Sequence, residues 1–144
     1  MTHPIVASAR GWIGTRFHHQ GRLKKTQNDK GGVDCLGLLV GVAKELSLRL
    51  EDGSYFAERD ETEYSHYPDV QRLRAVLSGM MHEIPVRGIE VGDILLLDID
   101  GNPQHLAIVS DVGMIHAYAP AKCVVEHVID EWWRSKIVAV FRVA

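Results

Sequence analysis

The periodicity of apolar residues changes near the middle of the chain. In the first half, apolar positions recur at helical spacing over residues 5–13 and 36–46, which predicts two helices. A third helix is expected from Pro68 to about Met80, with proline in its first turn. The polar, glycine-punctuated segment RFHHQGRLKKTQNDKGG indicates a long loop between the first two helices. The acidic segment EDGSYFAERDETEYSHYPD is interpreted as a surface excursion.

From Gly92 onward, short β-rich runs replace the helical pattern. Turn signals such as DGN, DVG and AP, together with the short DEWWRS segment, separate them. The runs are DILLLDI, QHLAIVS, GMIHAYA, KCVVEHVI and KIVAVFRV. They predict a meander of about five antiparallel strands. Helices followed by such a sheet indicate an α+β fold with the helices packed on the sheet, in a single domain over residues 1–144.

Composition and charge narrow the function classes. The 144 residues carry a formal net charge of −3, which gives no electrostatic footprint for nucleic acid or anionic lipid. The N-terminal MTHPIVASARGWIG lacks the features of a secretory signal, and no apolar run is long enough to span a membrane. We therefore expect cytoplasmic synthesis, no membrane insertion and two cysteines, Cys35 and Cys123, that remain thiols.

The segment GGVDCLGLL places a cysteine at the start of the second predicted helix. Asp34 is a good N-cap residue, and Gly37 and Gly41 would allow that helix to pack closely against a neighbour. A thiol in the first turn is expected to have a lowered pKa because of the helix dipole, and nearby backbone N–H groups suit an oxyanion. On position alone, the alternative that Cys35 is a small buried hydrophobic residue stays open.

Two histidines are candidate partners for Cys35. Alternation along QHLAIVS and GMIHAYA, with an even-numbered loop between them, places His105 and His116 on one face of the sheet. Their Cβ atoms would lie roughly 5 to 8 Å apart, which suits a general base and the group that orients it. Taken singly, each is better explained as a strand residue with a satisfied hydrogen bond. Taken together, the two interpretations are balanced.

The segments GGVDCLGLL, GDILLLDIDGNPQHLAIV and MIHAYAP, in this order and spacing, resemble the NlpC/P60 cysteine peptidases. The segments WIGTRFHHQG and WW...VAVFRV are similar to the bacteriophage and gene-transfer-agent branch of that family. The resemblance spans Trp12 to Arg142, although residues 48–85 contribute little to it.

The resemblance implies a papain-like α+β fold that cuts amide bonds in peptidoglycan stem peptides, between D-glutamate and a diamino acid. Carried over by position, Cys35 is the nucleophile, His105 the general base and His116 the orienting residue. It implies no cofactor or metal, a peptidoglycan peptide as substrate, phage tail proteins as partners, and association with a virion or prophage particle.

Two positions depart from the family pattern. Phe17 and Leu36 stand where many members have a tyrosine and a serine that hold the substrate's amino end, whereas Asp34, which shares that role, is kept. The substrate's N-terminal side is therefore expected to be read differently. His18 and His19 lie in the loop ahead of the nucleophile, and His18 is taken as a further candidate substrate contact.

Other interpretations remain open. One is a catalytically vestigial protein of tail assembly, and another is an acyltransferase or thioesterase that uses the same three residues. A zinc site at Cys35, His105, His116 and Cys123 is possible by ligand type, but it lacks the short ligand spacing of zinc sites. Cys123 is expected to pack in a strand, and Trp132 and Trp133 to cover the end of the sheet.

Overall fold

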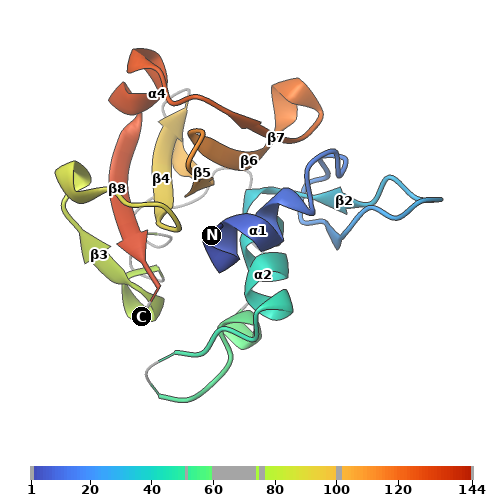
Figure 1. Ribbon diagram of the computed structural model, residues 1–144, viewed down its shortest axis with the longest axis horizontal. Coiled ribbons are helices and arrows are strands. Elements are labelled where there is room, and N and C mark those ends of the chain that lie inside the picture. Colours follow the sequence, from blue (N-terminus) through green and yellow to red (C-terminus); the bar gives the residue numbers. More distant parts are fainter. Residues whose placement is uncertain (1, 51, 60–73, 75–76, 100–101, 144) are drawn as a thin grey trace.

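The computed structural model describes residues 2–50, 52–59, 74, 77–99 and 102–143, and it confirms the predicted α+β class. The helices α1 (Pro4–Arg10) and α2 (Cys35–Glu45) pack against an antiparallel sheet (Figure 1). The strands of this sheet are β3 (His82–Ile84), β4 (Ile94–Ile99), β5 (Asn102–Val109), β6 (Met114–Tyr118), β7 (Cys123–His127) and β8 (Ile137–Arg142).

The sheet has the order β3-β8-β4-β5-β6-β7, so it has six strands rather than the expected five. Only β4 to β7 form a meander, because β8 returns across the sheet to pair with β4. The sequence DEWWRS was expected to be a turn, but it contributes the short helix α4 (Glu131–Ser135), which Asp130 caps. The additional edge strand, β3, is only three residues long, which is too short for alternation to predict it.

The long loop after α1 contains a small hairpin of β1 (Arg22–Leu23) and β2 (Gly32–Val33), which projects beside α2 (Figure 1). In the acidic segment, the described residues include the short 3₁₀ helix η1 (Phe56–Arg59). The side chain of Phe56 is 2% exposed and belongs to the core, so this part is not a surface excursion. Most of the predicted third helix lies outside the described residues. Within its range, residues 74 and 77–80 are described, and they are helical.

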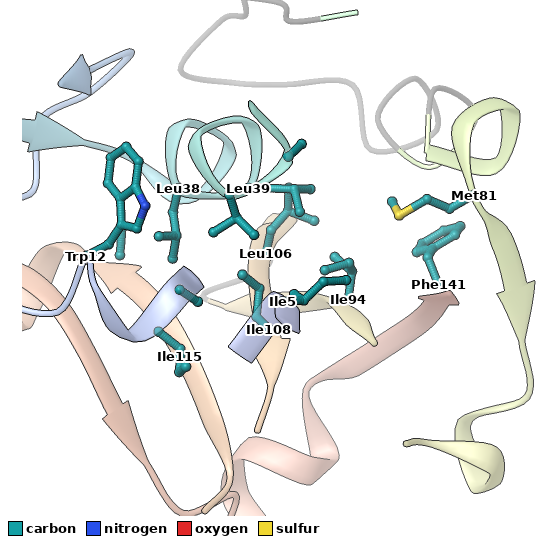
Figure 2. Close-up of a cluster of buried hydrophobic side chains, with 14 of the residues drawn as sticks. Ile5, Trp12, Leu38, Leu39, Met81, Ile94, Leu106, Ile108, Ile115 and Phe141 are labelled. Carbon is teal, nitrogen blue, oxygen red and sulfur yellow. The ribbon is translucent and has the colours of Figure 1, made fainter. Parts of the chain in front are cut away.

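Alternation along the strands divides the buried residues into two clusters, one on each face of the sheet. Leu96, Leu106 and Ile108 face α1 and α2, as Figure 2 shows for the last two, whereas Leu95 and Ala107 belong to the other cluster. Two further 3₁₀ turns occur between strands: η2 (Val86–Gly88) lies between β3 and β4, and η3 (Ala119–Ala121) connects the neighbouring strands β6 and β7.

The helix α2 lies unusually close to its neighbours, as its glycines predicted. A Cβ atom added at Gly41 would lie 2.2 Å from the Trp12 ring, and one added at Gly37 would lie 2.2 Å from the carbonyl oxygen of Gly21. Both distances are far below van der Waals contact. The close packing of α2 on the α1 side and on the β1–β2 hairpin therefore requires glycine at these two positions.

Candidate functional site

The helix α2 begins at Cys35 because Asp34 caps it. Asp34 has extended backbone angles, and its side chain accepts a hydrogen bond of 2.8 Å from the backbone N–H of Gly37. This confirms the predicted cap, and it fixes Cys35 in the first turn of the helix.

The Asp34 carboxylate is 4% exposed and makes further contacts within the chain. One oxygen also accepts from the Arg22 guanidinium at 3.2 Å, and the other accepts from the backbone N–H of Gln20 at 2.8 Å. Both oxygens are therefore engaged between the helix cap and the segment that leads into β1. In this arrangement Asp34 joins α2 to the hairpin.

The Cys35 thiol lies against β5. Burial is the main influence on it and raises its pKa to about 12, and the neighbouring Asp34 charge acts in the same direction. Backbone hydrogen bonds, the largest from Leu106, act in the opposite direction without compensating. The pKa of Cys35 is therefore raised and not lowered as the helix terminus predicted, because desolvation disfavours the thiolate.

The thiol's contact with Leu106 lies outside the stretch in which β5 pairs with β6. The two strands pair at Val109↔Met114 and Ile108↔Ile115. Leu106 lies two residues beyond this paired stretch on β5, and its backbone hydrogen bonds to the Cys35 thiol. Cys35 is thereby placed beside the residue that follows His105 in the chain.

His105 and His116 lie on one face of the sheet, as the alternation predicted. Continuing the β5–β6 register places His105 opposite Tyr118 and diagonal to His116. His105 Nε2 and His116 Nδ1 are 2.5 Å apart, which is hydrogen-bonding distance. The structure therefore brings these two predicted site residues together.

A third histidine, His127, extends this pair, and the sequence analysis did not identify it. His127 Nε2 lies 2.8 Å from His116 Nε2, and His127 Nδ1 lies 2.9 Å from the backbone oxygen of Val128. The register of β6 and β7 places His116 opposite Val125, so His127 is its diagonal neighbour on the same face. Alternation along CVVEHVI places His127 on one face of its strand. Recognising that this face is shared with His116 requires the pairing register of β6 and β7, which the sequence does not give.

Aromatic side chains cover the histidines. The Tyr118 ring stacks on His116 at a centroid distance of 4.9 Å, and the Trp133 ring from α4 lies 5.2 Å from both His116 and His127. Burial lowers the pKa of His105 to about 4. Burial, together with the neighbouring His105 and His127 rings, lowers the pKa of His116 to about 2. Both rings are therefore neutral at physiological pH.

The remaining predicted substrate contacts lie around the entrance to α2. Phe17 and Leu36 are partly buried and pack against the hydrophobic core, and Phe17 bridges to Val33 in β2. The ring of His18 is in hydrogen-bonding distance of the backbone oxygen of His19. Phe17 and Leu36 thus supply apolar surface and no hydrogen-bonding side chain.

Other predictions concern metals, thiols and membranes. Within the described ranges, no three His, Cys, Asp or Glu side chains form a group that could hold a metal ion. Cys123 begins β7, as expected, and neither it nor Cys35 is in a disulfide bond. Of the helices in the described part of the chain, none has the length and apolarity to cross a membrane.

Comparison with known proteins decides the family. The model of the NlpC/P60 family matches residues 14–142, which is nearly the whole chain. The chain belongs to the NlpC/P60 family. This confirms the resemblance at the level of the family, and the papain-like NlpC/P60 fold with it. A search of curated proteins found no significant match to this family member.

Solved structures of similar fold include other NlpC/P60 domains. The NlpC/p60 domain of the peptidoglycan hydrolase SagA is 24% identical, with a TM-score of 0.60, and the match covers 96% of this chain and 95% of that one. The P60 domain of an antigen from M. avium subspecies paratuberculosis is 16% identical, with a TM-score of 0.60 and coverage of 96% and 91%. An NLP/P60-family lipoprotein-like protein from Staphylococcus aureus is 17% identical, with a TM-score of 0.59 and coverage of 96% and 40%.

Proposed function

We propose that this NlpC/P60 protein is a cysteine endopeptidase that hydrolyses amide bonds in peptidoglycan stem peptides, between D-glutamate and a diamino acid. Membership of the family supports a cell-wall hydrolase. The observation that carries the cysteine chemistry is one arrangement. Cys35, at a helix N-terminus, contacts the backbone of Leu106, which adjoins the hydrogen-bonded His105–His116 pair.

In the proposed reaction, Cys35 Sγ attacks the carbonyl carbon of the scissile amide while His105 takes the thiol proton. The resulting imidazolium donates from Nε2 to His116 and then gives its proton to the leaving amine, which breaks the C–N bond. Water attacks the thioester with His105 again as base, which releases the new carboxylate and restores the thiol. The backbone N–H of Cys35 stabilises the developing oxyanion.

The neutral state of both partners shapes the first step. The raised pKa of Cys35 and the lowered pKa of His105 mean that the free protein holds a thiol and an imidazole, not an ion pair. Proton transfer therefore accompanies the attack on the carbonyl. A catalytic ion pair would form only as negative charge moves to the substrate oxygen.

The substrate's amino end is proposed to be bound without the two hydroxyl groups that many family members have. Phe17 and Leu36 present apolar surface, and Asp34 is already bonded to Arg22 and to the Gly37 amide. A site of this kind discriminates less against a stem peptide whose terminal amine is blocked, because it places fewer polar groups opposite that amine.

The proposal is tested by incubating purified peptidoglycan with the wild-type protein and with Cys35→Ala, and measuring newly released amino groups. Release by the wild type and none by Cys35→Ala is the expected result. Equal release by both proteins would remove Cys35 from the mechanism. Transfer to an added amine acceptor instead of water would identify the acyltransferase alternative, which uses the same acyl-enzyme.

A vestigial site is the second candidate, and the burial that keeps Cys35 protonated favours it. In that case the protein serves tail assembly. Association with a phage or prophage tail is itself a proposal, supported by the segments WIGTRFHHQG and WW...VAVFRV. Mass spectrometry of tail particles purified from induced source cells tests it, and absence of the protein from those particles would contradict it.

A further inference from the structure

The three histidines form a continuous hydrogen-bonded chain that ends on a backbone oxygen. His105 contacts His116 through Nε2 and Nδ1, His116 contacts His127 through their Nε2 atoms, and His127 Nδ1 contacts the oxygen of Val128. Each ring in the chain therefore faces the next with one nitrogen. Because a neutral imidazole has one donor and one acceptor nitrogen, these contacts restrict which tautomers can coexist.

The Val128 carbonyl, at the end of this row of histidines, determines the direction in which the hydrogen bonds run. A backbone oxygen only accepts, so His127 must carry its proton on Nδ1 and has an accepting Nε2 when neutral. His116 must then donate from Nε2, which leaves its Nδ1 as the acceptor. His105 must in turn donate from Nε2. The remaining nitrogen of His105, Nδ1, is thereby left without a proton.

We propose that His127 is a positioning residue that, through its bond to the Val128 carbonyl, fixes the tautomers of His116 and His105 so that His105 Nδ1 stays available as a base. This rests on the proposed function of His105. The low pKa values of His105 and His116 are consistent with neutral rings, which the argument requires. The three histidine rings can therefore all stay neutral until the catalytic proton transfer begins.

The surroundings of His127 are suited to holding one arrangement. Trp133 packs on both His127 and His116 at 5.2 Å, so it covers the contact between the two rings on one side. On the neighbouring turn, a Cβ atom added at Gly113 would lie 2.1 Å from the His127 carbonyl oxygen and 2.7 Å from Val128 Cα. The backbone that carries the accepting carbonyl is therefore closely packed.

Replacement of His127 by leucine removes the acceptor for His116 Nε2–H. His116 can then place its proton on Nδ1, where it opposes the Nε2 proton of His105, and the His105 proton is driven to Nδ1. The His127→Gln variant is the conservative partner, because a glutamine oxygen reaches the position of His127 Nε2 and accepts in its place. The matched controls are His82→Leu and His82→Gln, since His82 is exposed and lies on β3 at the opposite edge of the sheet.

The experiment is NMR of protein labelled with ¹⁵N in histidine, which distinguishes the two tautomers of each ring, combined with kcat and KM on a stem peptide. In the wild type we expect Nε2–H on His105 and His116 and Nδ1–H on His127. In His127→Leu we expect a mixture of tautomers at His105 and a fall in kcat of about 10-fold or more with KM nearly unchanged. His127→Gln should restore both, and the His82 variants should change neither.

Two results would overturn the inference. One is a wild-type spectrum with His105 protonated on Nδ1, which needs no variant to interpret. The other is an unchanged His105 tautomer in a folded His127→Leu protein. If the wild type shows the expected tautomers and cleaves no stem peptide, the proposed function fails while the tautomer assignment stands, so the two failures are distinguishable.

Discussion

The thiol of Cys35 lies where two influences on its pKa oppose each other. The helix terminus and the backbone N–H groups favour the thiolate, whereas burial and the nearby Asp34 carboxylate favour the thiol. Burial is the larger effect, so the sulfur becomes a strong nucleophile only while a base removes its proton. We propose that His105 removes this proton, which is the role that the family resemblance implies for it.

The ionisation of Cys35 can be measured directly. In a Cys123→Ser background, the thiolate absorbance of Cys35 is expected to be absent at pH 7 and to rise only in strongly alkaline solution, because burial raises its pKa to about 12. Ultraviolet absorbance titration provides the measurement. A thiolate already formed at pH 6 would contradict this account and would support the helix-dipole expectation.

His105 and His116 are expected to contribute unequally to kcat. His105→Ala removes the proposed base and should lower kcat by roughly 10³-fold or more, whereas His116→Ala should cost about 10- to 100-fold, because it removes only the orienting bond. Steady-state kinetics on a stem peptide compares them, and circular dichroism checks the fold. A larger loss in His116→Ala than in His105→Ala would reverse the two roles.

Part of this site follows from the sequence alone. Alternation along two strands and an even loop were sufficient to place His105 and His116 on one face, since side chains in a strand have a period of two. The sequence left the burial of Cys35 open as one of two interpretations, because burial depends on which strand meets the helix terminus. His127 was missed for a similar reason, since its role depends on the register between β6 and β7.

At the scale of elements, α2 is held by close backbone approach on two sides. Gly41 faces the Trp12 ring, and Gly37 faces the carbonyl of Gly21 in the segment before β1. The Asp34–Arg22 pair reinforces the second contact. Since α2 carries Cys35 on its first turn, the position of this proposed nucleophile depends on both contacts.

Alanine substitution tests the contact between α2 and Trp12. Gly41→Ala is expected to lower the free energy of unfolding by about 1 to 3 kcal/mol, because its Cβ would overlap the indole ring. The matched control is Gly79→Ala in the helical residues 77–80, where a Cβ meets nothing within 4 Å. That control should stabilise by about 0.5 to 1 kcal/mol, as urea unfolding can measure. Equal effects at the two positions would contradict the packing argument.

The sequence pattern predicted the major elements better than their connections. The helices at the N-terminal half and the five long strands were expected because each has several periods of its pattern. The strand β3 and the helix α4 are shorter, with 3 and 5 residues, so their periodicity carried little signal. The return of β8 beside β4 is a property of the whole sheet, and no local pattern encodes it.

At the scale of the whole molecule, buried neutral histidines link stability to pH. The folded pKa values of His105 and His116, about 4 and about 2, lie below the ordinary value of 6.5. Below pH 6.5 the unfolded chain therefore binds protons that the folded chain does not. The free energy of unfolding must decrease as the pH falls, until the pH passes through the folded values.

We expect each of these histidines to cost about 2 kcal/mol of stability between pH 7 and pH 5. Urea unfolding at the two pH values measures the loss for the wild type and for His116→Gln, which has no titrating ring at this position. The variant should lose less than the wild type, and the exposed-site control His82→Gln should behave as the wild type. Identical losses in His116→Gln and wild type would contradict the burial argument.

The most direct test of the central claim is mass spectrometry of defined muropeptides, with and without a free N-terminal L-alanine, after incubation with wild type and with Cys35→Ala. We predict cleavage by the wild type alone, at the bond between D-glutamate and the diamino acid, with the blocked and free peptides both accepted. No cleavage of any stem peptide by the wild type would contradict the account and favour a structural role.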